Sequence, residues 1–144
     1  MPSFPFTSPA PQTDRLLIDG EICSLDRRGR AQFKNLMFRR GNPPCFFAFD
    51  LLTYGKDLRT ERLLDRKQEL RRLLARACAP LKCTEYIDGC GMALFQRVCE
   101  LDLEGVVAKQ KFGPYVTERE HSTWFKIFES GIFTEGRQRR IVRA

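Results

Sequence analysis

The apolar run from Gly105 to Ala108 has a glutamate before it and a lysine after it, Glu104 and Lys109. Its length and its adjacent valines predict a short buried β-strand. Because successive strand residues face opposite sides, Glu104 should share one face with Val106, and Lys109 should share the other with Val107. A buried charge needs a counter-charge, a metal ion or a polyanion, since burying it alone is costly. The segment therefore fits a nucleotide-phosphate site, but taken alone it is more typical of an edge strand whose charged ends are solvated.

Three other segments place charged residues beside apolar strands in a similar way. Asp19-Gly20-Glu21 lies between apolar residues, and an aromatic run over 46–49 is followed by Asp50. Further along, Trp124 and Lys126 stand two residues apart, which puts them on one face of a predicted strand. In chain order the four segments give D-G-E, F-D-L-L, E-G-V-V-A-K and W-F-K.

This order of motifs resembles the adenylation domain of ATP-dependent DNA ligases, in particular the bacterial end-joining and repair types. The resemblance runs from about Leu16 to about Arg137, and four motifs in order with matching connectors are specific. The connector over 55–67 is similar to the family's G-x-D-L-R followed by L-x-x-R-K. The resemblance implies an α+β fold, a partial nucleotidyltransferase (ATP-grasp-like) domain with mostly antiparallel sheets and flanking helices.

The resemblance also implies a nucleotide site that uses ATP and Mg²⁺. Phe49 and Val107 match the aromatic and aliphatic side chains between which the family holds adenine, although both would also serve as ordinary core residues. Glu21 and Glu104 match carboxylates that contact the ribose or hold the divalent metal. Magnesium suits such a pair, because it prefers one or two carboxylates together with substrate phosphates.

Two lysines complete the set that the resemblance implies. Lys109 and Lys126 match lysines that approach the α-phosphate, where fixed cations neutralise the charge that develops during nucleotidyl transfer. Asp50 belongs to the same acidic group, but a structural carboxylate at a strand end or turn explains it equally well.

The chain departs from the family at its nucleophile and at a second lysine. The family's nucleophile is a lysine in K-x-D-G that attacks the α-phosphate of ATP and becomes adenylated. None of the seven lysines of this chain begins such a motif. Phe128 stands where the family has the second lysine of W-x-K-x-K, and a phenyl ring donates no hydrogen bond to a phosphate.

From these departures we expect a truncated adenylation domain that does not ligate DNA alone. The family continues beyond a G-R pair, here Gly136-Arg137, into an OB-fold that closes over the nucleotide and DNA, and this chain stops shortly after it. One alternative is a split ligase, in which a complementing segment supplies the K-x-D-G lysine. The other is a non-catalytic remnant that binds nucleotide or DNA. The expected partner is nicked or broken duplex DNA.

The net charge of +7 is concentrated toward the end of the chain, where the last eight residues hold four arginines and no acid. Such a tail attracts a phosphate backbone, so Arg137, Arg139 and Arg140 are candidate DNA contacts, although a solvated chain end has the same composition. By domain, residues 1–14 are expected to be a proline-rich, poorly ordered lead-in, 15–130 the partial adenylation domain, and 131–144 a basic linker stub.

Cysteine usage and hydropathy point to a reducing, aqueous compartment. The six cysteines stand singly without a C-x-x-C pair, and one histidine cannot complete a zinc site, so we expect free, buried thiols. His121 is expected at the surface. No apolar run is long enough to cross a bilayer and the start is not a secretory signal, so we expect a cytoplasmic protein without membrane contact.

Periodicity predicts the individual elements. The predicted strands are 16–18, 21–25, 45–49, 82–87, 106–110 and 124–128, and the predicted helices are 32–39, 61–77 and 92–101. The first helix should turn Phe33, Leu36 and Met37 inward. The second should present an apolar stripe of Leu63, Leu70, Leu74 and Ala77, and the third should pack Phe95, Val98 and Cys99.

Overall fold

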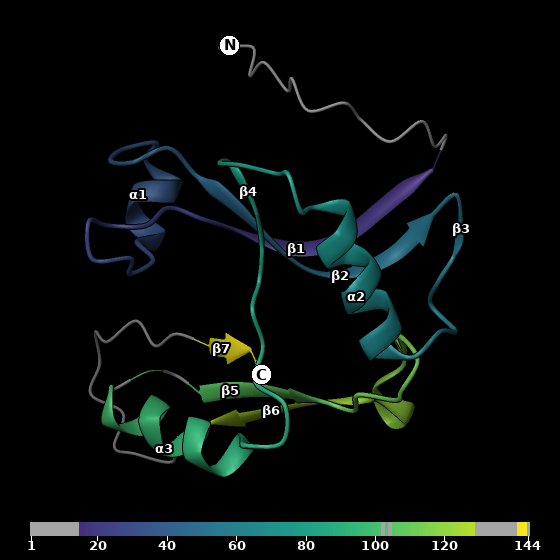
Figure 1. The fold of residues 1–144 in the computed structure, drawn as a ribbon. Helices are drawn as coiled ribbons and strands as arrows, with labels where there is room; N and C mark the ends of the chain where they lie inside the picture. Colours follow the sequence, from purple (N-terminus) through teal and green to yellow (C-terminus); the bar gives the residue numbers. More distant parts are fainter. Residues whose placement is uncertain (1–14, 102, 104, 129–140, 144) are drawn as a thin grey trace. The chain divides into compact units, whose positions relative to one another are not determined.

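The computed structural model describes residues 15–101, 103, 105–128 and 141–143 (Figure 1). They form two compact units, each with its own sheet. The first unit comprises Met1–Arg59 and Asp65–Cys83, and the second comprises Thr60–Leu64 and Thr84–Ala144. Helices and strands occur in both units, as an α+β fold requires.

The sheet of the first unit is organised around one long strand. β2 (Cys45–Tyr54) pairs antiparallel with β1 (Leu16–Cys23) and β3 (Lys56–Asp57), and parallel with β4 (Leu81–Cys83). β2 continues past residue 49, the predicted end, because Asp50 and Leu51 of the F-D-L-L motif also pair with β1. The predicted strands 16–18 and 21–25 form the single strand β1, which ends at Cys23 and not at residue 25. The strand predicted over 82–87 is wrong after Cys83, since the residues that follow do not pair.

The β1–β2 ladder is irregular where the D-G-E motif crosses it. Its register shifts between Leu17 and Ile18 and again between Asp19 and Gly20, and the second shift leaves Phe49 of β2 with no residue opposite. Bulges of this kind bend a strand and redirect its side chains. A Cβ atom on Gly20 would overlap the ring of Phe46 and approach the Phe47 carbonyl oxygen to 2.7 Å. Glycine is therefore needed for β1 to pass this close to β2.

The core of the first unit lies between β2 and α2 (Leu63–Leu73). Ala48, Leu51, Leu58 and Leu70 are buried, with Leu73, Leu74 and Leu81 packed partly buried against them. The predicted stripe is confirmed at Leu63 and Leu70, which are both buried. The helix is shorter than the predicted 61–77 span, and Ala77 lies beyond its end.

The inward face predicted for the first helix is wrong. α1 (Phe33–Met37) is a helix of five residues, and the side chains of Phe33 and Met37 are 57% and 60% exposed. Only Leu36 of the predicted three is half-buried. A helix of little more than one turn presents too few side chains to bury a stripe.

A buried ion pair joins α2 to β2. Asp50 has no exposed surface, and its two oxygens accept hydrogen bonds from Arg66 Nε at 2.8 Å and Arg66 Nη2 at 3.0 Å. The Leu51 N–H donates to Asp50 Oδ1 at 2.8 Å. The next helical residue, Lys67, donates to the carbonyl of Phe49 at 3.1 Å. Asp50 therefore has a structural role, but it lies within β2 and not at the predicted strand end or turn. The R-K pair of the connector binds the F-D-L-L strand.

Removing the cation of this pair should destabilise the protein strongly. In Arg66→Met the carboxylate of Asp50 stays buried without a counter-charge, which typically costs about 3–5 kcal/mol of unfolding free energy. Urea denaturation measures this loss. The matched control is Arg59→Met, because Arg59 and its partner Asp57 are 56% and 52% exposed and such pairs add little. Equal, small losses in both variants would contradict a structural role for the buried pair.

The exposed pair closes the turn after β3. The carboxylate of Asp57 accepts the backbone N–H of Arg59 at 3.0 Å and its guanidinium at 2.7 Å. These hydrogen bonds, the guanidinium first, lower the pKa of Asp57 from 3.8 to about 2. The D-L-R part of the connector therefore stabilises this turn through local hydrogen bonds.

This turn predicts a pH dependence that NMR can measure. Because the pKa of Asp57 is depressed in the folded state, its stabilising effect is present above about pH 4 and is lost as the pH falls through about 2. A ¹³C titration of the Asp57 carboxyl should give a midpoint near 2, and Arg59→Ala should move it toward 3.8. Identical midpoints in both proteins would rule out the guanidinium as the main cause.

The second unit is built on a sheet with β5 at its centre. β5 (Gly105–Lys109) pairs antiparallel with β6 (Trp124–Phe128) and parallel with β7 (Ile141–Arg143). α3 (Gly91–Glu100) contacts β5 and buries Val98, while Phe95 and Cys99 are half-buried, close to prediction. β6 has the predicted bounds, β7 was not predicted, and a 3-10 turn spans Arg119–His121.

The six cysteines are thiols outside any disulfide bond, as predicted, but none is buried. Cys78 and Cys90 are exposed, and the other four are half-buried. The prediction of buried thiols is wrong because Cys23, Cys45 and Cys83 occupy strand termini rather than strand centres. His121 is exposed, as expected, and its Nδ1 lies 3.4 Å from Glu118. In the part of the chain that the structure describes, no helix is long and apolar enough to span a membrane.

Candidate functional site

Three of the predicted nucleotide residues lie on one face of the β5–β6 pair. Val107 stands directly opposite Lys126, and Lys109 stands directly opposite Trp124. Opposite residues of an antiparallel pair project to the same side, and so do residues two apart along a strand. We call this side the lysine face, and it comprises Gly105, Val107, Lys109, Trp124, Lys126 and Phe128.

The ammonium of Lys109 is held over an aromatic ring. Its Nζ lies 4.1 Å from the centroid of the Trp124 ring, well within the range of cation–π attraction. Tyr115 in turn packs its ring edgewise against Trp124, with centroids 5.0 Å apart and an interplanar angle of 76°. Lys109 is half-buried in this setting. The tryptophan of the W-x-K motif therefore positions the lysine of the neighbouring strand.

The rest of the lysine face combines a buried apolar side chain, Val107, with an exposed cation, Lys126. Val107 is 5% exposed, whereas Lys126 opposite it is exposed. Phe128 is 52% exposed and stands opposite Gly105. The face thus offers a buried aliphatic surface, two cations and two aromatic rings.

Gly105 allows β5 and β6 to approach closely. A Cβ atom at this position would overlap the carbonyl oxygen of Ile127 and come within 3.0 Å of two more backbone atoms of β6. Its φ of 157° also lies outside the usual range of residues with side chains. The glycine of E-G-V-V-A-K is therefore a requirement of the ladder that aligns the lysine face.

Gly105→Ala should disrupt the lysine face through its backbone. The added methyl group forces β5 away from β6, and overpacking of this kind typically costs about 1–3 kcal/mol. Thermal unfolding followed by circular dichroism measures the loss. The matched control is Gly91→Ala at the start of α3, where a Cβ meets nothing within 4 Å and alanine favours the helix. A Gly105→Ala protein as stable as the control would contradict the close approach.

The remaining predicted residues divide between the first unit and positions outside the described residues. Glu21 is exposed on β1 opposite Phe47. Phe49 is 4% exposed, in the bulge of β2, and its carbonyl is bound by Lys67. The positions that lie outside the described residues are Glu104, Arg137, Arg139 and Arg140.

The described residues supply no complete metal cage. Within the described ranges, no group of three or more histidine, cysteine, aspartate or glutamate side chains could hold a metal ion. Asp50 is engaged by Arg66, so it does not join an acidic group. Of the predicted metal ligands, Glu21 alone lies in the described part of the chain.

Sequence reasoning missed two features of the site. Tyr115 was not singled out, although an aromatic residue near a predicted tryptophan is a signal for ring packing. The contact between Lys109 and Trp124 could have been found from the strand pattern, because residues with the same facing on paired strands meet.

Comparison with known proteins relates most of the chain to one family. The sequence model of the family described as "ATP dependent DNA ligase domain" matches residues 4–127. The bifunctional non-homologous end joining protein LigD of Bacillus subtilis is 31% identical over 138 residues, covering 77% of this chain and 22% of that protein. The multifunctional non-homologous end joining protein LigD of Pseudomonas aeruginosa is 33% identical over 119 residues, covering 78% of this chain and 14% of that protein.

Solved structures give the same relationship. The ligase domain of LigD from M. tuberculosis matches with a TM-score of 0.62 at 34% identity, over 78% of this chain and 37% of that one. A mycobacterial DNA ligase D complexed with ATP and MES matches with a TM-score of 0.62 at 34% identity, over 77% of this chain and 37% of that one. This chain spans less than a quarter of the length of the two end-joining proteins.

Proposed function

This chain belongs to the family of ATP-dependent DNA ligase domains, and we propose that its lysine face binds ATP within an adenylation domain. In this proposal the fold is a nucleotidyltransferase domain of the ATP-grasp-like kind, and the substrate is nicked or broken duplex DNA. The observation that supports it is the shared facing of Val107, Lys109 and Lys126 on β5 and β6. A related mycobacterial ligase is described as complexed with ATP.

Three side chains of the lysine face have a matching part in a nucleotide. An aliphatic side chain such as Val107 suits the flat apolar surface of adenine, with Phe49 as the aromatic counterpart. Lys109 and Lys126 suit the phosphates, because nucleotidyl transfer depends mainly on positioned charges. The contact with Trp124 at 4.1 Å restricts where the Lys109 ammonium can point. Such prior ordering lowers the cost of binding a phosphate.

Magnesium would be held by Glu21 and Glu104 together with the nucleotide. One or two carboxylates plus substrate phosphates are a usual set for Mg²⁺, so a site without a third protein ligand suits the ion. When bound, the ion neutralises phosphate charge. We further propose that Arg137, Arg139 and Arg140 contact the DNA backbone, and that the protein works in the cytoplasm, where ATP and DNA are both present.

We propose that the 144-residue chain does not become adenylated by itself, because none of its lysines begins K-x-D-G. A complementing ligase segment would supply that lysine. The second candidate function is nucleotide or DNA binding without catalysis. Phe128 favours this candidate, since an exposed phenyl ring occupies the lysine face where the family has another lysine.

The binding proposal predicts the effect of removing each cation. With Mg²⁺ present, Lys109→Met and Lys126→Met should each weaken ATP binding about tenfold or more, since charge-assisted hydrogen bonds contribute roughly 1.5–3 kcal/mol. Isothermal titration calorimetry measures the affinity. Lys34→Met is the control, because Lys34 is an exposed lysine of α1. Phe128→Lys should strengthen binding by restoring the third cation. Unchanged affinity in both Lys→Met variants would exclude the lysine face as the phosphate site.

Adenylation is tested separately with ATP labelled in its α-phosphate. The chain with Mg²⁺ alone should acquire no acid-stable label, and label on the isolated chain would refute the proposed inactivity. Label that appears on an added polypeptide bearing K-x-D-G, and depends on Lys126, would establish a split ligase. ATP binding without label in either mixture would favour the non-catalytic candidate.

A further inference from the structure

Cys23 and Cys45 stand directly opposite each other at the paired ends of β1 and β2. Opposite residues of antiparallel strands have Cα atoms about 4.5–5.5 Å apart. That separation falls within the range of about 4.4–6.8 Å found between disulfide-linked residues. The side chains also project to the same side of the sheet. Neither cysteine is in a disulfide bond in this structure.

The backbone around the two cysteines is held in place from both directions. On one side the ladder continues, with Ile22 opposite Phe46. On the other, the Ser24 hydroxyl donates to the Asn42 carbonyl at 3.1 Å, and the Asn42 side chain donates to the Leu25 carbonyl at 2.8 Å. With the backbone held in this register, the thiols would close a disulfide by rotation about their Cα–Cβ bonds, between staggered rotamers.

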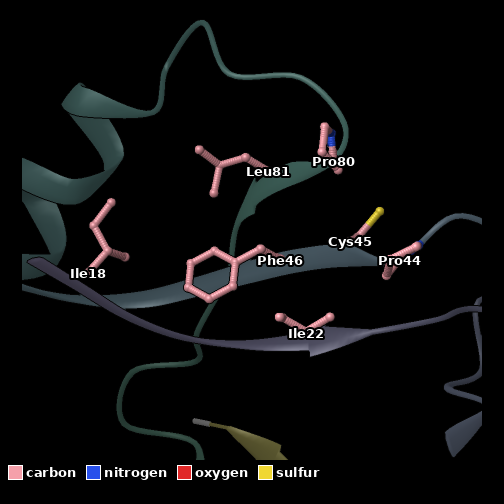
Figure 2. Close-up of a pocket in the computed structure, with 7 residues that line it drawn as sticks. All are labelled: Ile18, Ile22, Pro44, Cys45, Phe46, Pro80 and Leu81. Atoms are coloured by element: carbon pink, nitrogen blue, oxygen red, sulfur yellow. The ribbon is translucent and has the colours of Figure 1, made fainter. Parts of the chain in front are cut away.

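Small molecules can reach this pair. Cys23 and Cys45 are both half-buried rather than enclosed. Cys45 also lines an open apolar pocket of about 350 Å³, where it lies beside Pro44 and Phe46 (Figure 2). Half-exposed thiols are the ones that exchange with dissolved disulfides, whereas enclosed thiols are inert.

No other two cysteines stand opposite each other in the strand pairings of the described residues. Cys83 stands opposite Ala48 in the parallel pairing of β4 with β2, and Cys78 lies on the exposed turn before it. Cys90 and Cys99 are separated by the length of α3, about 13 Å at the helical rise. Within the described ranges, Cys23 and Cys45 are the only cysteines that are strand partners.

We propose that Cys23 and Cys45 form a thiol–disulfide exchange site for low-molecular-weight disulfides such as glutathione disulfide. One cysteine thiolate attacks glutathione disulfide, forms a mixed disulfide and releases one glutathione thiolate. The second cysteine thiolate attacks the protein sulfur of that mixed disulfide, closes the Cys23–Cys45 bond and releases the second glutathione. Two protein thiols are oxidised, one glutathione disulfide is reduced, and the two thiol protons pass to the two glutathiones.

The bond would link the D-G-E strand covalently to the F-D-L-L strand. It closes the loop from Cys23 to Cys45, which contains α1, and so restricts the unfolded chain. In a reducing compartment such a bond is reversible, which makes it a response to oxidants rather than a permanent cross-link. The inference rests on strand register and holds whether or not the chain binds ATP.

Peptide mapping tests the site directly. The reduced, full-length chain is incubated with mixtures of reduced and oxidised glutathione, quenched with acid and N-ethylmaleimide, and digested with trypsin. Cys23 then lies in peptide 16–27 and Cys45 in peptide 41–56, each without another cysteine. We expect these two peptides to be joined, at least about tenfold more often than any other pair. The oxidised protein should melt roughly 5 °C or more above the reduced protein.

Single substitutions give the controls. Cys78→Ser should leave the linked pair and the shift in melting temperature unchanged. Cys23→Ser and Cys23→Ala should abolish both and leave Cys45 capped by glutathione, and Cys45→Ser should do the reverse. The proposal is overturned if both thiols stay capped by glutathione without closing, or if the dominant link joins another pair.

Discussion

A carboxylate with no exposed surface needs a cation and further hydrogen-bond donors in place of its water, and Asp50 has both. Arg66 contacts both of its oxygens, and the Leu51 N–H supplies a third hydrogen bond. The pair fixes the rotation of α2 against β2, so that Leu70 enters the core beside Ala48 and Leu51. It also places Lys67 on the carbonyl of Phe49, at the bulge of β2. The position of Phe49 in β2 thus depends on contacts made by two neighbouring residues of α2, Arg66 and Lys67.

The second unit uses backbone proximity and an aromatic ring instead of a buried ion pair. Gly105 lets β5 run close to the Ile127 carbonyl, and the resulting register sets Lys109 opposite Trp124. Tyr115 orients the Trp124 ring, and the ring attracts the Lys109 ammonium. The motif residues of the lysine face therefore have two different roles. Gly105 and Trp124 fix the geometry of the face, whereas Lys109 and Lys126 carry its positive charge.

The sequence could predict which side chains share a face of a strand, because that depends only on the two-residue period of a β-strand. The facing of Val107 and Lys109, and of Trp124 and Lys126, follows from alternation alone, and the structure has it so. Asp50 could not be assigned in this way, because a buried ion-paired carboxylate and a metal ligand at a strand end look identical in sequence. The choice depends on Arg66, sixteen residues away. The bulge at Phe49, the exposure of α1 and the pairing of Cys23 with Cys45 likewise depend on contacts between distant residues.

A chain without a K-x-D-G lysine can still retain the residues that shape the lysine face and those that carry its charge. Nucleotide binding needs an apolar surface and cations, and the proposed function assigns these to Val107, Lys109 and Lys126 on β5 and β6. Covalent catalysis needs in addition a reactive amine placed against the α-phosphate. In this proposal, a missing amine would prevent adenylation and would leave the residues proposed to bind nucleotide in place. Phe128 gives the lysine face one positive charge fewer than a lysine at this position would. It keeps the pairing register of β5 and β6, because a phenyl ring is readily accommodated in a β-strand. The missing K-x-D-G lysine and Phe128 should accordingly impair nucleotide binding less than they impair adenylation.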